Sequence, residues 1–348
     1  MKKLLRRAVR QVRHVRPTPA GSARGLVAEV YGQVERDFGM LAPPVALHSP
    51  APEVLGAAWL TLRETLLAGT TRRQDREAVA AAISVANSCP YCVAVHSSTL
   101  HALAPGRDAA AIAAGQTELV ADPALRQATA WAVAAEPMPL TAVAAAELVG
   151  VVVTFHYLNR MVNVFLGESP LPPELPAAAR GPMGKVLGRV LRPRGTLAPG
   201  PSLRLVPEAV LPEDLNWAAG SPPVADAYAQ ATGAIEAAGR RTVPGPVRHL
   251  VADALDGWDG RPKGLSRAWV EEATAGLDAK LAPVAVLTLL TAMASYQVTP
   301  PDVAAFREVS PDDRALVEAT AWASMAAARR LGERLWHWHL SATRRDLS

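Results

Sequence analysis

A stretch rich in proline interrupts this chain near its middle and limits where long regular elements can form. Residues 170–223 contain 12 of the 30 prolines, and a proline inside a helix removes a backbone donor and clashes with the preceding turn. We therefore expect a linker over residues 170–223 in which helices cannot be long, with a short helix at residues 183–191. At 348 residues the chain is also longer than a single hydrophobic core usually is. It is predicted to hold two domains, one on each side of the linker.

The residues on both sides of the linker favour helices. Half of the chain is hydrophobic but only 5% is aromatic. Alanine and leucine dominate, and they form helices more readily than pleated sheets. Short turn segments divide residues 24–169 into several expected helices, at residues 42–44, 49–52, 69–71, 104–106 and 137–139. The composition and the turns together predict an all-α protein.

Residues 1–23 form a basic N-terminal arm. The arm carries seven lysines and arginines and no acidic residue, whereas the formal net charge of the whole chain is only +4, so the remainder is slightly acidic. Apolar residues alternate with these charges, which is typical of a basic amphipathic segment that contacts an anionic lipid or nucleic-acid surface. A solvated, partly ordered tail is the alternative that we favour. We expect no nucleic-acid partner and leave membrane contact of the arm open.

Two features of the sequence bear on the compartment of the protein. No uninterrupted apolar segment follows the charged start, so a cleaved signal peptide is not expected. The alanine-rich stretch at residues 142–153 contains Glu147 and is shorter than a membrane span, which leaves no transmembrane candidate. We therefore expect a cytoplasmic protein.

The second half of the chain repeats the first in weakened form. The sequence Gln-Ala-Thr-Ala-Trp-Ala at residues 127–132 returns as Glu-Ala-Thr-Ala-Trp-Ala at residues 318–323. Likewise Val-Tyr-Gly-Gln at residues 30–33 returns as Ala-Tyr-Ala-Gln at residues 227–230. The two offsets, 191 and 197 residues, are similar, as expected when insertions accumulate between copies of one unit. The pattern predicts two fused repeats, with chance similarity among alanine-rich helices as the alternative.

The two predicted copies, over residues 24–169 and 224–348, differ in their chemistry. The apolar helix at residues 78–86, which precedes the chain's cysteines, corresponds to residues 284–294 in the second copy. There the chain continues as Ser-Tyr-Gln from Ser295, with no cysteine and no equivalent histidine. The second copy is therefore predicted to be a degenerate helical domain that serves as scaffold, and the first to be the catalytic domain.

The chain's two cysteines, Cys89 and Cys92, lie in one short run with His96. Residues three or four apart share one face of a helix, so a helix that starts here would align all three side chains and allow the sulfurs to close a disulfide. A helix N-terminus and a neighbouring histidine both favour the reactive thiolate, and Pro90 suits a first helical turn. A Cys-x2-Cys pair in a reducing compartment indicates redox or metal chemistry.

Glu77 lies twelve residues before Cys89, on the apolar helix that leads into the motif. A carboxylate on that helix would be partly buried, which requires a reason. Acting as a base through His96 or a water, it would draw the proton from the attacking thiol. Without the downstream spacing, the simpler interpretation of Glu77 is a solvated charge at a helix start, because it follows the charged run at residues 72–76.

The spacing Glu-x11-Cys-x2-Cys-x3-His of these four residues resembles the active-site signature of AhpD-like alkylhydroperoxidases, in the carboxymuconolactone decarboxylase superfamily. The run at residues 156–163 is similar to a later helix of that family, and the resemblance covers roughly residues 25–170. It implies an all-helical fold, usually oligomeric, in which a thiol pair reduces peroxides and is recycled by an external dithiol donor.

Carried onto this chain, the resemblance makes Cys92 the peroxidatic thiol and Cys89 the resolving thiol, with Glu77 and His96 as the proton relay. The order of the two thiols is less constrained than their participation. Family members often have a histidine between the cysteines, where this chain has Tyr91. The decarboxylase branch of the superfamily generally lacks the cysteine pair, so the resemblance disfavours lactone decarboxylation.

These observations together predict a thiol-dependent peroxide reductase with one active copy. It would act on a peroxide and be reduced by an external thiol or dithiol protein, and no cofactor or metal is expected. A fused pair of units also predicts a smaller homo-oligomer than single-unit relatives form. A protein dithiol–disulfide oxidoreductase and a non-catalytic helical scaffold with an idle signature are the two alternatives.

Other candidate sites are weaker. His337 and His339 are two residues apart and would face different sides of a helix, which disfavours a metal site there. A zinc site at the two cysteines would have only His96 and His101 nearby as further ligands. His156 is predicted either to line the site or to be a hydrogen-bonded core histidine.

Overall fold

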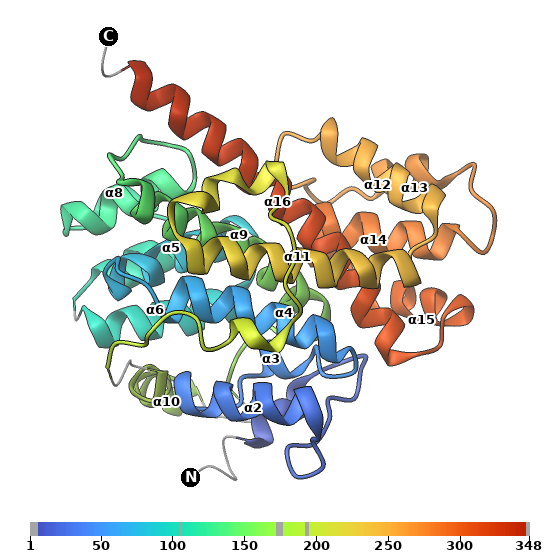
Figure 1. Ribbon diagram of the computed structural model, residues 1–348, viewed down its shortest axis with the longest axis horizontal. Coiled ribbons are helices and arrows are strands. Elements are labelled where there is room, and N and C mark those ends of the chain that lie inside the picture. The colour runs from blue at the N-terminus through green and yellow to red at the C-terminus, as the bar shows by residue number, and fades with distance from the viewer. Residues whose placement is uncertain (1–5, 105, 172–176, 192–194, 346–348) are drawn as a thin grey trace.

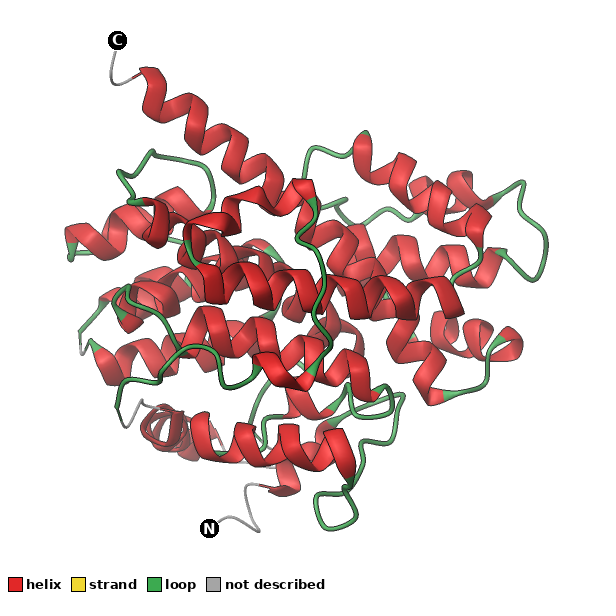
Figure 2. Cartoon of the chain, in the orientation of Figure 1, coloured by secondary structure: helices red, strands yellow, loops and turns green. Residues whose placement is uncertain are grey.

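The regular elements of the structure are helices, as the composition of the chain predicts. The computed structural model describes residues 6–104, 106–171, 177–191 and 195–345. Within that part of the chain there are helices, turns and loops but no β-strand (Figure 2), and one isolated β-bridge joins Ala68 and Leu197. The prediction of an all-α protein is therefore confirmed. That the two halves are copies of one unit stays a prediction.

The first half contains the helices that carry the thiol motif. In chain order they are η1 (Arg6–Gln11), α2 (Gly25–Asp37), α3 (Pro43–Ala46), α4 (Pro52–Leu62), the π-helix η2 (Arg63–Leu67), α5 (Arg73–Ala86), α6 (Pro90–Leu103), α7 (Asp108–Ala113), η3 (Thr117–Leu119), α8 (Pro123–Ala132) and α9 (Ala142–Phe165). Proline occupies the first or second position of α3, α4, α6 and α8, where a missing N–H has no intrahelical partner to lose.

The second half follows the proline-rich stretch, which itself contains helical segments. The elements from that stretch to the C-terminal region are α10 (Ala177–Leu191), η4 (Leu203–Leu205), η5 (Glu213–Gly220), α11 (Pro222–Thr242), α12 (Gly245–Asp256), α13 (Ala268–Thr274), α14 (Ala282–Ala294), η6 (Ser295–Gln297), α15 (Pro300–Val309) and α16 (Asp313–Arg345). Helix α11 lies along α4 and helix α16 lies along α9, so the two halves pack against each other (Figure 1).

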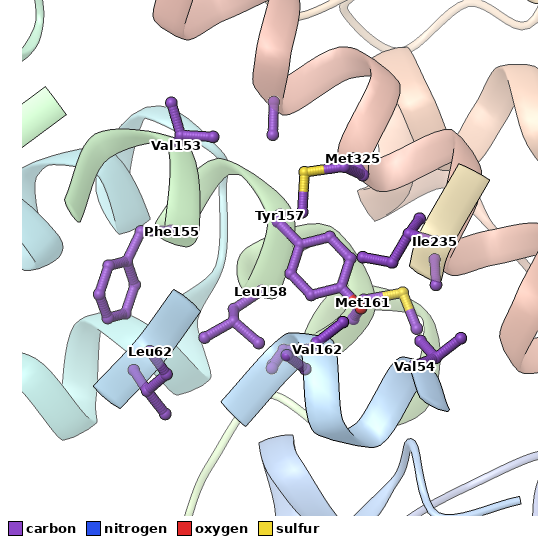
Figure 3. Packing of buried hydrophobic residues seen from close by; sticks show 14 of the residues in the cluster. Val54, Leu62, Val153, Phe155, Tyr157, Leu158, Met161, Val162, Ile235 and Met325 are labelled. Atoms are coloured by element: carbon purple, nitrogen blue, oxygen red, sulfur yellow. The ribbon is translucent and has the colours of Figure 1, made fainter. Parts of the chain in front are cut away.

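Helix α9 runs through the middle of the molecule and is buried along almost all of its length. Figure 3 shows Tyr157 and Met161 of α9 among apolar side chains of three other helices: Val54 of α4, Ile235 of α11 and Met325 of α16. One hydrophobic core therefore contains residues from both halves. Apolar burial of this kind is the main favourable contribution to folding, so α9 is the element that joins the halves.

The length of α9 also corrects one expectation. The helix continues beyond residues 142–153 to Phe165, so by length and composition alone it could cross a membrane, and the expectation of no such candidate was wrong. In the structure, 78% of its most apolar window is buried. Burial within the protein is typical of the core helix of a globular fold, and such a helix can be as long and as apolar as a membrane-spanning one.

Helix α10 lies within the predicted linker and is longer than the helix expected at residues 183–191. The helix begins at Ala177. Of the prolines in residues 170–223, only Pro182 lies within it. The helix packs against α6. Gly188 permits this close approach, since a Cβ atom there would overlap the backbone carbonyl of Ser98. Helix α10 therefore covers the helix that carries the thiols.

The described part of the basic arm packs on the body of the molecule. The side chains of Val15 and Ala23 are buried, and the backbone N–H of Arg13 donates to the carbonyl of Phe165 at 2.8 Å. Residues 1–5, which hold the first two lysines of the arm, lie outside the described residues.

A buried carboxylate on α9, that of Glu147, fixes the chain just before α5. It accepts hydrogen bonds from the N–H groups of Thr70 and Thr71, at 2.7 and 2.8 Å, and from their hydroxyls, at 3.1 and 2.7 Å. Although burial favours the neutral acid, these four bonds hold the pKa of Glu147 below its usual range. Gly69 makes the approach possible, because its φ is +115° and a Cβ atom there would lie 2.9 Å from the carboxyl carbon.

Replacing Glu147 should test this anchor. We expect Glu147→Ala to lower the free energy of unfolding by about 2 kcal/mol, because it removes four hydrogen bonds to an ionised carboxylate. In the wild type, the contribution of Glu147 is fully present above its unfolded pKa and is lost as the pH falls through its lower folded pKa. Denaturant unfolding as a function of pH measures both effects. The control is Glu53→Ala, which removes an exposed ion pair with Arg314; equal losses in the two variants would contradict the assignment.

Candidate active site

A tight turn between α5 and α6 brings the cysteine motif to the start of a helix, as predicted. Asn87 ends α5, and Cys89 is the residue just before Pro90, with which α6 begins. Between them Ser88 has a φ of +51°, in the left-handed region that residues other than glycine rarely adopt. The N–H of Cys89 donates to the carbonyl of Ser84 at 3.0 Å, which closes the turn.

The two thiols lie side by side in the interior. Both cysteines are free, and their Sγ atoms are 2.8 Å apart. Cys89 is completely buried and Cys92 is 4% exposed. Burial, together with the neighbouring Cys89, raises the pKa of the Cys92 thiol well above its usual value, and a hydrogen bond from Asn159 only partly opposes this. Cys92 is therefore protonated at neutral pH and needs a base before it can act as a nucleophile.

Glu77, His96 and Arg73 form a buried chain of charge-assisted hydrogen bonds. The Nδ1 atom of His96 lies 2.7 Å from Oε2 of Glu77. The other carboxylate oxygen, Oε1, accepts from Nε and Nη2 of Arg73 at 2.8 and 2.5 Å. Glu77 is only 1% exposed, so it is not the solvated helix-start charge considered as the alternative. The imidazole of His96 also packs edge-on against the ring of Phe155, with centroids 4.4 Å apart, which restrains its orientation.

The charges around Glu77 determine its ionisation state. Burial alone would raise the pKa of Glu77, but the charge of Arg73 and the bond to His96 outweigh it and lower the pKa to about 2. Glu77 is therefore an ionised carboxylate throughout the physiological range. Such a group is too weak a base to take a thiol proton itself. It can orient the imidazole of His96 through Nδ1 and stabilise the imidazolium that forms when Nε2 takes a proton.

An apolar cavity of about 60 Å³ lies against the thiol site. Cys92, His96 and Tyr91 line it, whereas Cys89 does not. The remaining lining is apolar and comes from several elements: Ala8, Phe38, Met40, Ala42, Pro43, Pro44, Val45, Leu62, Val95, Phe155, Leu158, Pro170 and Leu191. The cavity thus gives a small apolar molecule access to one sulfur and one imidazole.

Tyr91 contributes a phenol to this cavity. Its side chain is buried, and its hydroxyl has no hydrogen-bond partner among the residues that the structure describes. Burial and the two neighbouring thiols keep the pKa of Tyr91 far above its usual range, so the hydroxyl retains its proton. Tyr91 is therefore a protonated phenol among the residues that line the cavity.

Polar side chains of α9, among them Asn159 and His156, lie next to the turn that carries the thiols. Nδ2 of Asn159 donates to the hydroxyl of Ser84 at 2.9 Å, and its side chain also bonds to Cys92. Nδ1 of His156 lies 3.1 Å from Oδ1 of Asn87. Burial and the nearby Arg160 lower the pKa of His156 well below its usual value. His156 is therefore a neutral, hydrogen-bonded histidine and lies outside the cavity lining.

The other predicted candidates do not form a site. His339 is buried and accepts from Nε1 of Trp131 at 3.4 Å, whereas His337 is exposed. Across the part of the chain that the structure describes, no three histidine, cysteine or acidic side chains lie together in a way that could hold a metal ion.

Sequence reasoning missed two polar side chains that bond to the predicted four, those of Arg73 and Asn159. Arg73 is four residues before Glu77 on α5, a spacing that brings opposite charges together on a helix, so the pair could have been found. Asn159 is 75 residues from Ser84 in the chain, and no local pattern indicates that contact.

The fold and the site define an all-helical protein with a buried dithiol beside a histidine that is hydrogen-bonded to an ionised glutamate. The chain belongs to the carboxymuconolactone decarboxylase family, whose model matches residues 53–134 and so includes all four predicted residues. It is 41% identical over 328 residues to the alkyl hydroperoxide reductase Rv2159c of Mycobacterium tuberculosis, an alignment that covers 92% of this chain and 94% of that protein. No solved structure matches the chain. The resemblance noted in the motif is confirmed at the level of the family.

Removing the charge of Arg73 should change the ionisation of Glu77. We expect Arg73→Met to raise the pKa of Glu77 from about 2, because burial is then opposed by His96 alone. Carbon-13 NMR titration of the glutamate carboxyl carbons measures this shift directly. The control is Arg72→Met, since Arg72 is half-exposed and pairs with Asp75 instead. The same Glu77 titration in both variants would show that Arg73 does not hold the carboxylate ionised.

Proposed function

We propose that this protein is a thiol-dependent reductase of organic hydroperoxides, with Cys92 as the thiol that attacks. The observation that carries the proposal is that Cys92, and not Cys89, lines the apolar cavity together with His96. His96 is in turn hydrogen-bonded to the ionised Glu77. The printed name of the mycobacterial relative, an alkyl hydroperoxide reductase, supports the same reaction class.

In the first step, Nε2 of His96 takes the proton of the Cys92 thiol, and Glu77 stabilises the imidazolium through Nδ1. The thiolate attacks the terminal oxygen of the hydroperoxide, so that the S–O bond forms as the O–O bond breaks. The departing alkoxide receives the proton from the imidazolium. The thiol has become a sulfenic acid, the peroxide has become an alcohol, and His96 has returned to its neutral form.

In the second step, Cys89 acts as the resolving thiol. Its sulfur attacks the sulfenic sulfur of Cys92, the disulfide forms and the hydroxyl leaves as water. The 2.8 Å separation of the two Sγ atoms supports this step, because little movement is needed. An external thiol or dithiol protein then reduces the disulfide by exchange and restores both thiols. A reducing compartment such as the cytoplasm would supply that reductant.

Tyr91 has a place in the first step as a hydrogen-bond donor to the leaving oxygen. Its unpaired phenol lines the cavity beside Cys92 and retains its proton. A donor aimed at developing negative charge stabilises a transition state more than a ground state. No net proton transfer from the phenol is needed, because His96 supplies the proton.

The alternatives are supported less well. The mainly apolar cavity at Cys92 suits a small organic molecule better than a protein disulfide, and the printed name of the relative is that of a peroxide reductase. An idle signature in a scaffold would leave a buried ionised glutamate without a use, although such groups are costly to bury. A homo-oligomer smaller than that of single-unit relatives stays a prediction.

Single-turnover oxidation of the reduced protein should separate the roles of these residues. With cumene hydroperoxide in a stopped-flow instrument, we expect Cys92→Ser to abolish the rapid phase. His96→Gln should slow it by about 100-fold or more, since it removes the base, and Glu77→Gln should slow it less. Cys89→Ser should retain the phase but accumulate sulfenic acid. The control is His101→Gln, on the exposed side of the same helix; equal rates for it, His96→Gln and Cys92→Ser would remove the proposed mechanism.

The role of Tyr91 has its own measurement. We expect Tyr91→Phe to slow the reaction of Cys92 with hydroperoxide by about ten-fold, because one donor to the leaving oxygen is lost. Its reaction with iodoacetamide should be unchanged, since that reagent has no O–O bond to break. Equal slowing of both reactions would mean that the phenol acts on the thiol and not on the peroxide.

A further inference from the structure

The turn that carries the thiols has an unfavourable backbone conformation that something must hold in place. Ser88, immediately before Cys89, has a φ of +51° although it is not glycine. A residue in this region persists only when the surrounding structure determines its conformation. The contacts of the neighbouring Asn87 show what that surrounding structure is.

Four side chains on one edge of α9 hold Asn87. Its Oδ1 accepts from Nδ1 of His156 at 3.1 Å and from Nη1 of Arg160 at 3.2 Å. Its Nδ2 donates to Oδ1 of Asn159 at 3.3 Å, and its backbone carbonyl accepts from Nδ2 of Asn163 at 3.1 Å. These α9 residues are three, four and seven positions apart, so they share one face of the helix. The side chain and the carbonyl of Asn87 are thus both fixed.

Two of these side chains are anchored at the same time on the second half of the chain. Nδ2 of Asn163 lies 3.0 Å from the hydroxyl of Ser295, and Nε of Arg160 donates to the carbonyl of Ala292 at 2.8 Å. Ser295 ends α14 as Asn87 ends α5. Asn163 and Arg160 therefore connect the C-terminal ends of the two helices that the sequence predicted to be equivalent.

The charge of Arg160 fits this position. The residue is 5% exposed, and no carboxylate lies within ion-pair distance of it among the described residues. Backbone carbonyls at the end of a helix carry partial negative charge, and the guanidinium lies at the ends of both α5 and α14. Its carbon also lies 5.8 Å from the centroid of the Trp258 ring, another residue of the second half. The cation therefore depends on the second half for part of its stabilisation.

We propose that Asn163 and Arg160 are positioning residues, and that through Ser295 and Ala292 the second half of the chain holds the thiol-bearing turn in its reactive geometry. The segment that replaces the cysteine motif in the second half thus has a role of its own, as the hydrogen-bond partner of α9. The proposal rests on the proposed function, because it concerns the same dithiol. Loss of the anchor would let Asn87 and Cys89 shift relative to Cys92 and so change the ease of disulfide formation.

Ser295→Ala tests the anchor from the second half, at a residue that does not line the cavity. We expect this variant to slow the condensation of the Cys92 sulfenic acid with Cys89 by about ten-fold, because small misplacements of reacting groups have effects of this size or larger. The equilibrium constant of the Cys89–Cys92 disulfide against dithiothreitol should shift in favour of the dithiol by a similar factor. Ser295→Thr, which keeps the hydroxyl, should restore both values.

The matched control is Ser324→Ala, which removes a hydroxyl of the second half that is also buried and has no hydrogen-bond partner among the described residues. If Ser295→Ala and Ser324→Ala give the same condensation rate and the same equilibrium constant, or if Ser295→Thr fails to restore them, the positioning role is wrong. The equilibrium constant is measured without peroxide. A wild-type protein that is inert to peroxide, but whose equilibrium constant shifts on Ser295→Ala, would remove the proposed function and keep the positioning role.

Discussion

The burial of α9 between the two halves is the constraint on which the rest of the structure depends. Most of its surface must be apolar, because it packs against helices from both halves. The same helix carries a row of polar side chains toward α5, and buried polar groups are tolerated only when they find partners. They find them at the turn between α5 and α6, at the end of α14 and in one another. Core packing and thiol geometry are therefore properties of one element.

The thiol site combines an apolar environment with a small number of compensated charges. The interior raises the pKa of the Cys92 thiol, so the resting sulfur is protonated and unreactive. The same interior strengthens the attraction of Arg73 and His96 for Glu77, which stays ionised. The pKa values of these two acidic groups are thus shifted in opposite directions, and His96 is hydrogen-bonded to the carboxylate of Glu77. The nearby cavity is lined mainly by carbon, which suits an organic hydroperoxide better than a charged substrate.

The second half holds neither of the chain's two cysteines but is part of the site's structure. The alignment of the whole chain with the mycobacterial relative covers 92% of the chain, so it includes both halves. In this molecule the second half buries one side of α9 and accepts hydrogen bonds that originate beside the thiols. Fusion of two units, if that is the origin of the chain, would let one unit keep the chemistry while the other keeps the geometry.

The sequence by itself determined the elements and the chemistry that depend on short spacings. Helical composition predicted the all-α fold. The spacing of Cys89, Cys92 and His96 predicted their common helix face, because residues three and four apart share a face, and the family resemblance added Glu77 to them. Only the tertiary structure decided what surrounds that group. The contact between Asn163 and the Ser295 hydroxyl joins residues 132 positions apart, and the cavity is lined by segments from several elements. Such contacts follow from how helices pack, and no local pattern encodes them.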